Sequence, residues 1–127
     1  MCIRDRIFAG PIADVENAYA AADLFVFLPL YEPSANVCLE ALAAGLPVVT
    51  TVQNGAAEWL EPGVTGTLVP NPAATGDVVQ AIQFRQSRRS QPRLRLPLDS
   101  FSLERNMAET LAILELAVRE KAGRAAS

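Results

Sequence analysis

Short apolar runs alternate with stretches of helical periodicity along most of the chain. Four runs have the length of a strand, and they lie at residues 7–9, 23–29, 47–51 and 66–69. Such runs, punctuated by Gly, Pro or Asp, predict strands. The run at 23–29 is too dense in apolar side chains for a strand with one wet face, which favours a strand covered on both faces, as in parallel sheets.

Helices are expected between and after these runs, over residues 15–22, 36–44, 55–60, 76–86 and 103–122. Asp14 and Ser102 stand at N-cap positions, where short polar side chains accept hydrogen bonds from the first amides. Gly45 follows the second helix, and glycine is common just after a helix end.

Strands that alternate with helices predict an α/β fold, here a Rossmann-like, doubly wound parallel sheet. Such sheets bind ligands in the crevice at the carboxyl ends of their strands. The loops after Gly10, Leu28 and Thr51 are therefore the first places to look for a site.

Two features stand apart from this alternation. A stretch rich in Ser, Gln and Pro is interpreted as a solvated connector, and it carries Arg85, Arg88, Arg89, Arg93 and Arg95. The last helix has an apolar stripe at helical spacing, formed by Met107, Leu111, Leu114 and Val118. That stripe is expected to belong to the core or to a domain interface, partly exposed where its partner is absent.

The composition narrows the class of protein. The 127 residues suit one domain, with 50% apolar and 20% charged residues, as in ordinary globular proteins. A net charge of -3 gives no reason to expect nucleic acid as a partner. The lack of histidine removes the commonest general base and the commonest metal ligand. No apolar run reaches the roughly 18 residues of a membrane span.

The cysteines and the first residues bear on compartment and domain limits. Cys2 and Cys38 are too few for a disulfide framework, and Cys38 falls in an apolar helical pattern typical of a buried residue, which indicates a reduced, cytoplasmic chain. No signal peptide is visible. Residues 1–6 are interpreted as a non-native or truncated start. We expect a domain over 7–122, incomplete at its N-terminus, and a tail over 123–127.

Two carboxylates bracket the start of the second helix. Glu32 falls in the loop after the strand at 23–29, and Glu40 lies on the second turn of the helix that begins near Asn36. The first amides of a helix lack partners within it, and the helix dipole places positive charge behind them, which makes an anion site without a basic side chain. A nucleoside diphosphate sugar fits a site with such amides in the middle and carboxylates on both flanks. Taken alone, the two glutamates also fit solvated surface residues.

Residues 32–49 resemble the Glu-x7-Glu signature of retaining glycosyltransferases of the GT-B fold, family 4 above all. That signature reads E-P-x-x-x-x-x-L-E-A-x-A-x-G-x-P-V-V. Residues 20–26 are similar to the family's strand entry, Asn54-Gly55 stands where the family has two glycines, and residues 63–69 are similar to its d-G-x-t-G-x-L-V. This ordered series covers residues 7–84 well, and its details are most similar to bacterial enzymes that glycosylate lipopolysaccharide core or related surface polysaccharides.

The resemblance implies that the chain is the donor-binding half of a GT-B fold, and it implies roles for single residues. Glu32 is implied to contact hydroxyls of the donor sugar as the catalytic residue, though not as a covalent nucleophile, and Glu40 to hold the ribose hydroxyls. Main-chain amides are implied to contact the sugar and diphosphate, and the turn at Asn54-Gly55 to shape the pocket wall. The implied donor-binding set is Glu32, Ser34, Ala35, Asn36, Val37, Glu40, Asn54 and Gly55.

The resemblance also implies the reaction. A hexosyltransferase of this kind moves a sugar from a nucleoside diphosphate sugar to an acceptor with retention of configuration, and it uses neither a cofactor nor a bound metal. The acceptor domain and the Arg-Lys pair that neutralises the leaving diphosphate are expected before Ile7, outside this chain, which is therefore expected to be inactive alone. The full-length enzyme is expected in the cytoplasm, and a peripheral association with the inner membrane stays open.

Departures from the family leave some points open. Ser34-Ala35 replaces the Phe-Gly of many members, and Asn54 replaces a glycine, although Asn tolerates positive φ. The donor sugar is therefore not fixed by the resemblance. Two alternatives also remain, namely a non-catalytic α/β nucleotide-binding or interaction module and a fragment of a GT-B nucleotide-sugar epimerase. The lack of histidine argues against the epimerase, since such enzymes place histidines in the cleft.

Overall fold

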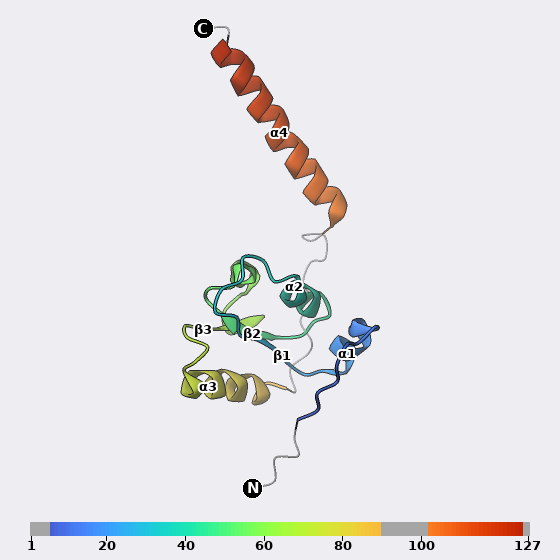
Figure 1. The fold of residues 1–127 in the computed structure, drawn as a ribbon, viewed down its shortest axis with the longest axis vertical. Coiled ribbons are helices and arrows are strands. Elements are labelled where there is room, and N and C mark those ends of the chain that lie inside the picture. Colours follow the sequence, from blue (N-terminus) through green and yellow to red (C-terminus); the bar gives the residue numbers. More distant parts are fainter. Residues whose placement is uncertain (1–5, 90–101, 126–127) are drawn as a thin grey trace. The chain divides into compact units, whose positions relative to one another are not determined.

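The computed structural model describes residues 6–89 and 102–125 (Figure 1). Residues 1–5, 90–101 and 126–127 lie outside the described residues, and so do Cys2, Arg93 and Arg95 and nearly all of the expected start. The chain forms two compact units, Met1–Leu94 and Arg95–Ser127.

The first unit alternates helices and strands, as the sequence predicts. In chain order it contains α1 (Val15–Ala21), β1 (Phe25–Phe27), α2 (Asn36–Ala43), β2 (Val48–Thr51), the 3-10 helix η1 (Gly55–Trp59), β3 (Gly66–Val69) and α3 (Thr75–Gln86). The three strands are parallel and lie in the order β1-β2-β3. The α/β class with a parallel sheet is confirmed, and it is consistent with a Rossmann-like half of a GT-B fold.

The core lies on both faces of the central strand β2, whose four residues are all buried. On one face Val49 packs with Val69 of β3 and Ala81 of α3. Successive side chains of a strand point to opposite faces. Val48 and Thr50 therefore point to the other face, and there α2 contacts β1 and β2. Figure 1 shows α2 and α3 on opposite sides of the sheet, as a two-sided α/β layer requires.

The strand predicted at residues 7–9 is not formed. Ile7 and Phe8 are 92% and 96% exposed, and the segment has no regular secondary structure. A strand takes its main-chain hydrogen bonds from a neighbour. Among the described residues, no strand pairs with this segment, and the sheet contains only β1, β2 and β3. The apolar run alone was not enough to make a strand.

The strand at 23–29 was predicted to be buried on both faces, but β1 is partly exposed on one of them. The strand itself spans only Phe25–Phe27, and Val26 is 40% exposed. The register places Val26 beside Val49, on the face that α3 covers. However, α3 contacts β3 and lies at the far side of the sheet order from β1. The outer strand β1 therefore keeps Val26 open to solvent.

Arg85, predicted to belong to a solvated connector, is a buried residue of α3 with 6% exposure. Its guanidinium donates to the Thr67 hydroxyl at 2.9 Å, to the Val64 carbonyl at 2.9 Å and to the Gly66 carbonyl. Burial, and secondarily the charge of Arg88, lowers the pKa of Arg85. Arg88 and Arg89 are exposed, as expected. The connector interpretation was wrong for Arg85, because β3 and the turn before it present a hydroxyl and carbonyls that its guanidinium reaches.

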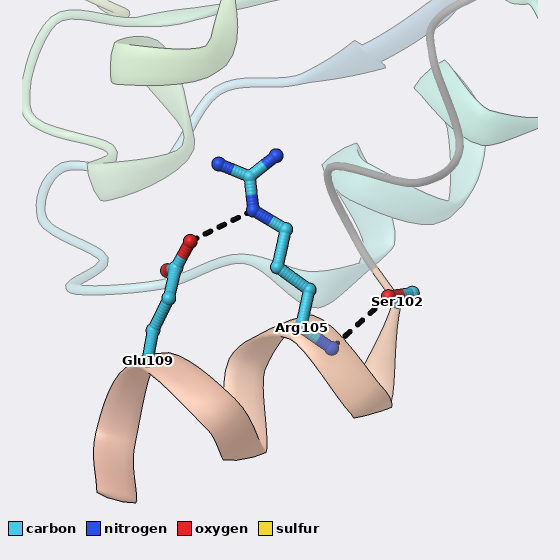
Figure 2. A network of polar contacts seen from close by, with 3 residues as sticks. All are labelled: Ser102, Arg105 and Glu109. Carbon is cyan, nitrogen blue, oxygen red and sulfur yellow. Dashed lines mark hydrogen bonds and ion pairs between the residues drawn. The ribbon is translucent and has the colours of Figure 1, made fainter. Parts of the chain in front are cut away.

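The second unit contains α4 (Leu103–Ala125). Ser102 is confirmed as its N-cap, because its side-chain oxygen accepts from the Arg105 amide at 3.2 Å. Figure 2 shows this contact next to the ion pair between Arg105 and Glu109, which are 2.8 Å apart. Asp14 occupies the N-cap position of α1 but makes no side-chain cap hydrogen bond. The expected cap is thus formed at one helix and not at the other.

The apolar stripe on α4 is exposed. Its four members are between 58% and 67% exposed, and they are Met107, Leu111, Leu114 and Val118. The stripe therefore forms no core within the second unit. It is exposed, as expected for an apolar face whose partner is absent. Among residues 6–89 and 102–125, no helix combines the length and the apolar character that crossing a membrane requires.

Candidate functional site

The loop that follows β1 lies against the loop that follows β2. Glu32 and Asn54 form an isolated parallel bridge. The Glu32 amide donates to the Gln53 carbonyl at 3.3 Å, and the Gly55 amide donates to the Glu32 carbonyl at 2.8 Å. The loops after Leu28 and Thr51 were two of the three places where a site was expected, and parallel strands end at the same edge of a sheet. The structure brings Glu32, Asn54 and Gly55 together at this edge.

Gly55 allows the two loops to approach closely. A Cβ atom on Gly55 would overlap the carbonyl oxygen of Pro33 and lie 2.8 Å from its carbonyl carbon. Real Cβ atoms essentially never come that close to backbone, so any side chain at this position must push the Pro33 segment away. The glycine at position 55 is therefore a packing requirement of the Glu32 loop.

Asn54 connects three elements through a buried set of hydrogen bonds. Its side-chain oxygen accepts from the Ala56 amide at 3.1 Å and thereby caps η1. Its side-chain nitrogen donates to the Thr50 hydroxyl of β2 at 2.8 Å and to the Cys38 sulfur of α2 at 3.3 Å. Its φ is -90°, so the tolerance of asparagine for positive φ is not used. The buried Asn54 side chain thus links β2, α2 and η1, while the pocket-wall role implied for the Asn54-Gly55 turn stays a prediction.

Replacing Asn54 with alanine is expected to lower the free energy of unfolding of the first unit by about 2 kcal/mol, because η1 loses its cap and Thr50 loses a buried partner. Urea unfolding followed by the fluorescence of Trp59, the only tryptophan, measures the change. The control is Gln53→Ala, which removes an exposed side chain with one 3.3 Å contact to the Pro70 carbonyl and should cost at most about 0.5 kcal/mol. Equal losses in the two variants would contradict the structural role of Asn54.

The N-terminus of α2 directly follows the Glu32 loop and has no side-chain cap. Its N-cap residue is Ala35, which is buried and has no side-chain oxygen, while Asn36 and Val37 are exposed. One oxygen of Glu32 accepts from the Ser34 amide at 3.2 Å. The first amides of a helix carry partial positive charge and favour anions. The Glu32 carboxylate and the uncapped helix start thus lie within one short stretch of chain, residues 32–37.

Glu40 is contacted by a residue of α1 and not by the loop that contains Asn54 and Gly55. The Tyr19 hydroxyl of α1 donates to Oε2 of Glu40 at 3.0 Å. Tyr19 is 8% exposed, and its ring meets that of Phe25 edge-on, with centroids 5.8 Å apart. The structure therefore joins Glu40 to α1, while Glu32 is joined to the loop of Asn54 and Gly55. The sequence predicted a helix over residues 15–22 but not the contact of Tyr19 with Glu40.

Residues 3–84 match the glycosyl transferases group 1 family, over more than half of the 127-residue chain. The chain belongs to this family. The family match ends within α3, so it includes the Glu32 loop, α2 and the Asn54-Gly55 turn. The general resemblance to glycosyltransferases is thereby confirmed.

Several relatives agree with membership in the glycosyl transferases group 1 family. The chain is 40% identical over 62 residues to the lipopolysaccharide core biosynthesis glycosyltransferase LpsE of Rhizobium meliloti, which is 49% of this chain and 18% of the relative. It is 41% identical over 59 residues to the lipopolysaccharide glucosyltransferase WaaG of Escherichia coli, covering 46% of the chain and 16% of WaaG. It is 37% identical over 83 residues to N-acetyl-alpha-D-glucosaminyl L-malate synthase of Bacillus anthracis, covering 65% of the chain and 22% of the relative. The chain thus matches less than a quarter of the length of each of these proteins.

The phenol of Tyr19 is expected to make the stability of this group 1 domain depend on pH. Burial raises the pKa of Tyr19 above its ordinary value of 10.0, and the hydrogen bond to Glu40 and the charges of Glu40 and Cys38 act in the same direction. A pKa raised in the folded state means that the folded chain holds the proton more tightly. The stabilisation is present below pH 10 and is lost as the pH rises through the raised pKa.

We therefore expect the free energy of unfolding of the wild-type chain to fall more steeply above pH 10 than that of Tyr19→Phe. Urea unfolding at a series of alkaline pH values measures both curves. Parallel curves would contradict a raised pKa. The other tyrosine, Tyr31, is 76% exposed, so Tyr31→Phe is the matched control and should follow the wild-type curve.

Within residues 6–89 and 102–125, the cysteine and acidic side chains form no group of three that could hold a metal ion. The roles of Glu32 and Glu40 toward a donor, and the expectation of a reaction without bound metal, stay predictions.

Proposed function

We propose that the chain is the donor-binding part of a GT-B glycosyltransferase of family 4, which transfers a hexose from a nucleoside diphosphate sugar with retention of configuration. The observation that carries the proposal is the uncapped start of α2 beside the Glu32 loop, in a chain of the glycosyl transferases group 1 family. The match of Glu32 and Glu40 to the Glu-x7-Glu signature supports the choice of family 4 and, with it, retention.

In this proposal the diphosphate of the donor rests against main-chain amides at the start of α2. Asn36 and Val37 are exposed there, so a ligand can reach them without unfolding the helix. The helix dipole favours the negative charge of the diphosphate. The main chain of the exposed Ser34 extends this surface toward the sugar, while Ala35 beside it is buried. No basic side chain from residues 32–37 is needed to hold the anion.

The two carboxylates then hold the two ends of the donor. Glu32 is half-exposed and accepts hydrogen bonds from hydroxyls of the sugar, while Glu40 accepts them from the ribose. Carboxylates accept several hydrogen bonds at once, so the existing bonds from Ser34 to Glu32 and from Tyr19 to Glu40 leave positions for ligand hydroxyls. The wall formed by Asn54 and Gly55 closes the site beside Glu32.

Catalysis in this proposal comes from positioning and from stabilising charge. Negative charge builds on the diphosphate oxygens as the bond to the sugar breaks. The amides and dipole of α2 stabilise that charge, and Glu32 fixes the sugar in the orientation needed for transfer. Glu32 does not form a covalent bond with the sugar. The basic pair and the acceptor site belong to other parts of the full-length enzyme, so the chain alone binds a donor without turnover.

The relatives support a direction for the biological role. Two of them are named for lipopolysaccharide synthesis and a third for Vi polysaccharide biosynthesis. We therefore assign the full-length enzyme to the synthesis of lipopolysaccharide or another surface polysaccharide. It would work in the cytoplasm, and a peripheral association with the inner membrane stays open.

Calorimetric titration of the 127-residue chain tests the proposal with UDP, GDP, ADP and dTDP and with one sugar ester of whichever nucleotide binds. Glu40→Ala should weaken the nucleoside diphosphate and the sugar ester alike, by about tenfold, because both contain the ribose. Glu32→Ala should weaken only the sugar ester, since the nucleotide alone does not reach Glu32. Glu104→Ala, on α4, is the control and should change neither affinity.

The outcomes separate the alternatives. Absence of binding by the wild-type chain to every nucleotide in the panel would argue for an interaction module and against a donor site. Binding that neither Glu32→Ala nor Glu40→Ala changes would place the nucleotide elsewhere and would also refute the proposal.

A further inference from the structure

The Glu40 side chain is exposed, yet it is tied to a buried group. Exposed glutamates ordinarily sample several rotamers, and fixing them costs conformational entropy. Here Oε2 of Glu40 accepts a hydrogen bond of 3.0 Å from the Tyr19 hydroxyl, and that tyrosine is almost fully buried. A carboxylate only accepts hydrogen bonds, so the phenol is the donor. The orientation of Glu40 is therefore set by α1, a different helix from its own.

Tyr19 is well placed to act as a fixed support. Its ring meets Phe25 of β1 at 74° with centroids 5.8 Å apart, an edge-to-face arrangement that aromatic pairs favour. Phe25 is in turn paired with Val48 of the central strand β2. The support for Glu40 thus runs through α1 and β1 to the buried centre of the sheet, and it does not depend on mobile surface groups.

We infer that Tyr19 is a positioning residue that orients the Glu40 carboxylate for the paired hydroxyls of a ribose. This inference rests on the proposed donor-binding function. The phenol uses one acceptor position of the carboxylate, and the remaining positions are directed by that contact before a nucleotide arrives. The ligand then does not have to order the Glu40 side chain, which would otherwise reduce its affinity.

The experiment measures the affinity of the 127-residue chain for the nucleoside diphosphate that binds in the titration panel. Tyr19→Phe keeps the buried ring and its contact with Phe25 and removes only the hydroxyl. It is expected to weaken binding by about three- to tenfold, the cost of ordering one long side chain on binding. Tyr31→Phe removes the same group from the chain's other, exposed tyrosine and should leave the affinity unchanged.

A double-mutant cycle separates positioning from general structural support. If Tyr19 acts through Glu40, Tyr19→Phe has no further effect in a Glu40→Ala chain. If Tyr19 only supports the fold, its loss weakens binding by the same factor in both backgrounds, and the inference fails. Unchanged affinity in Tyr19→Phe alone would also overturn it.

A second variant leaves the buried tyrosine untouched. Glu40→Asp shortens the side chain by one methylene, so its carboxylate no longer reaches both Tyr19 and a ligand, and binding should weaken at least as much as in Tyr19→Phe. Unchanged affinity in Glu40→Asp would refute the positioning role. Failure of the wild-type chain to bind any nucleotide is a different result, since it refutes the proposed function, and the role of Tyr19 with it.

Discussion

Replacing Gly55 with alanine is expected to lower the free energy of unfolding of the first unit by about 3 kcal/mol or more, at the upper end of the cost of overpacking. The new Cβ would overlap the Pro33 carbonyl oxygen and lie 2.8 Å from its carbon. Both are backbone atoms, so no side-chain rotation can relieve the overlap. The relief available is separation of the Glu32 loop from the η1 turn, which breaks the 2.8 Å hydrogen bond from the Gly55 amide to Glu32.

Urea unfolding followed by the fluorescence of Trp59 is a direct measurement, because that residue lies in η1, four positions after the substitution. The matched control is Gly76→Ala in the first turn of α3, where an added Cβ meets nothing within 4 Å. Gly76→Ala should stabilise the unit by about 0.5–1 kcal/mol, because alanine favours a helix over glycine. The two glycine substitutions are thus expected to have opposite signs. A Gly55→Ala chain as stable as the wild type would show that the two loops do not pack as described.

The contact that makes Gly55 irreplaceable also bears on function. If the Glu32 loop moves away from η1, Glu32 and the start of α2 change their position relative to Asn54. Gly55→Ala should therefore weaken a sugar ester more than the nucleoside diphosphate, because the sugar is the part proposed to contact Glu32. The close approach of Gly55 to the Pro33 backbone therefore affects both the stability of the fold and the proposed site.

Local signals in the sequence predicted most of the elements. The apolar runs at 47–51 and 66–69 became β2 and β3, and all five expected helical segments are present. Gly45 has φ of 79°, a value that favours glycine and ends α2 where expected. Ser102 caps α4. These features depend on neighbours within a few residues, which is why the sequence alone indicates them.

Features that depend on distant partners were not predictable in the same way. The run at residues 7–9 has the composition of a strand, but strand formation needs a neighbour, and its side chains are exposed. The exposure of Val26 depends on how far α3 extends across the sheet. The meeting of Glu32 and Asn54 was predictable, because a general rule about parallel strands covers it. The contact between Tyr19 and Glu40 joins residues 21 positions apart, and no such rule covers it.

Replacing Arg85 with alanine is expected to destabilise the first unit by about 3 kcal/mol. The guanidinium donates to the Thr67 hydroxyl and to the carbonyls of Val64 and Gly66. A hydrogen bond to a charged group contributes a net of about 1.5–3 kcal/mol, and the cost of burying the charge offsets part of the sum. Among the described residues, no carboxylate forms an ion pair with Arg85. Its burial is therefore offset by these oxygens, and removing it takes a donor from each, although the Gly66 carbonyl keeps the Gly63 amide at 3.0 Å.

Two further variants make this prediction specific to Arg85 in the urea experiment. Arg88→Ala removes an exposed arginine that contacts the Gly63 carbonyl at 3.1 Å and lies 4.5 Å from the centre of the Phe84 ring, and it should cost less than about 1 kcal/mol. Arg85→Lys should be intermediate, because one ammonium cannot reach Thr67, Val64 and Gly66 as a planar guanidinium does. If Arg85→Ala cost no more than Arg88→Ala, Arg85 would contribute no more than an exposed arginine. The expected order instead makes Arg85 the residue that holds α3 against the turn before β3, and β3 pairs with the central strand of the sheet beside the proposed donor site.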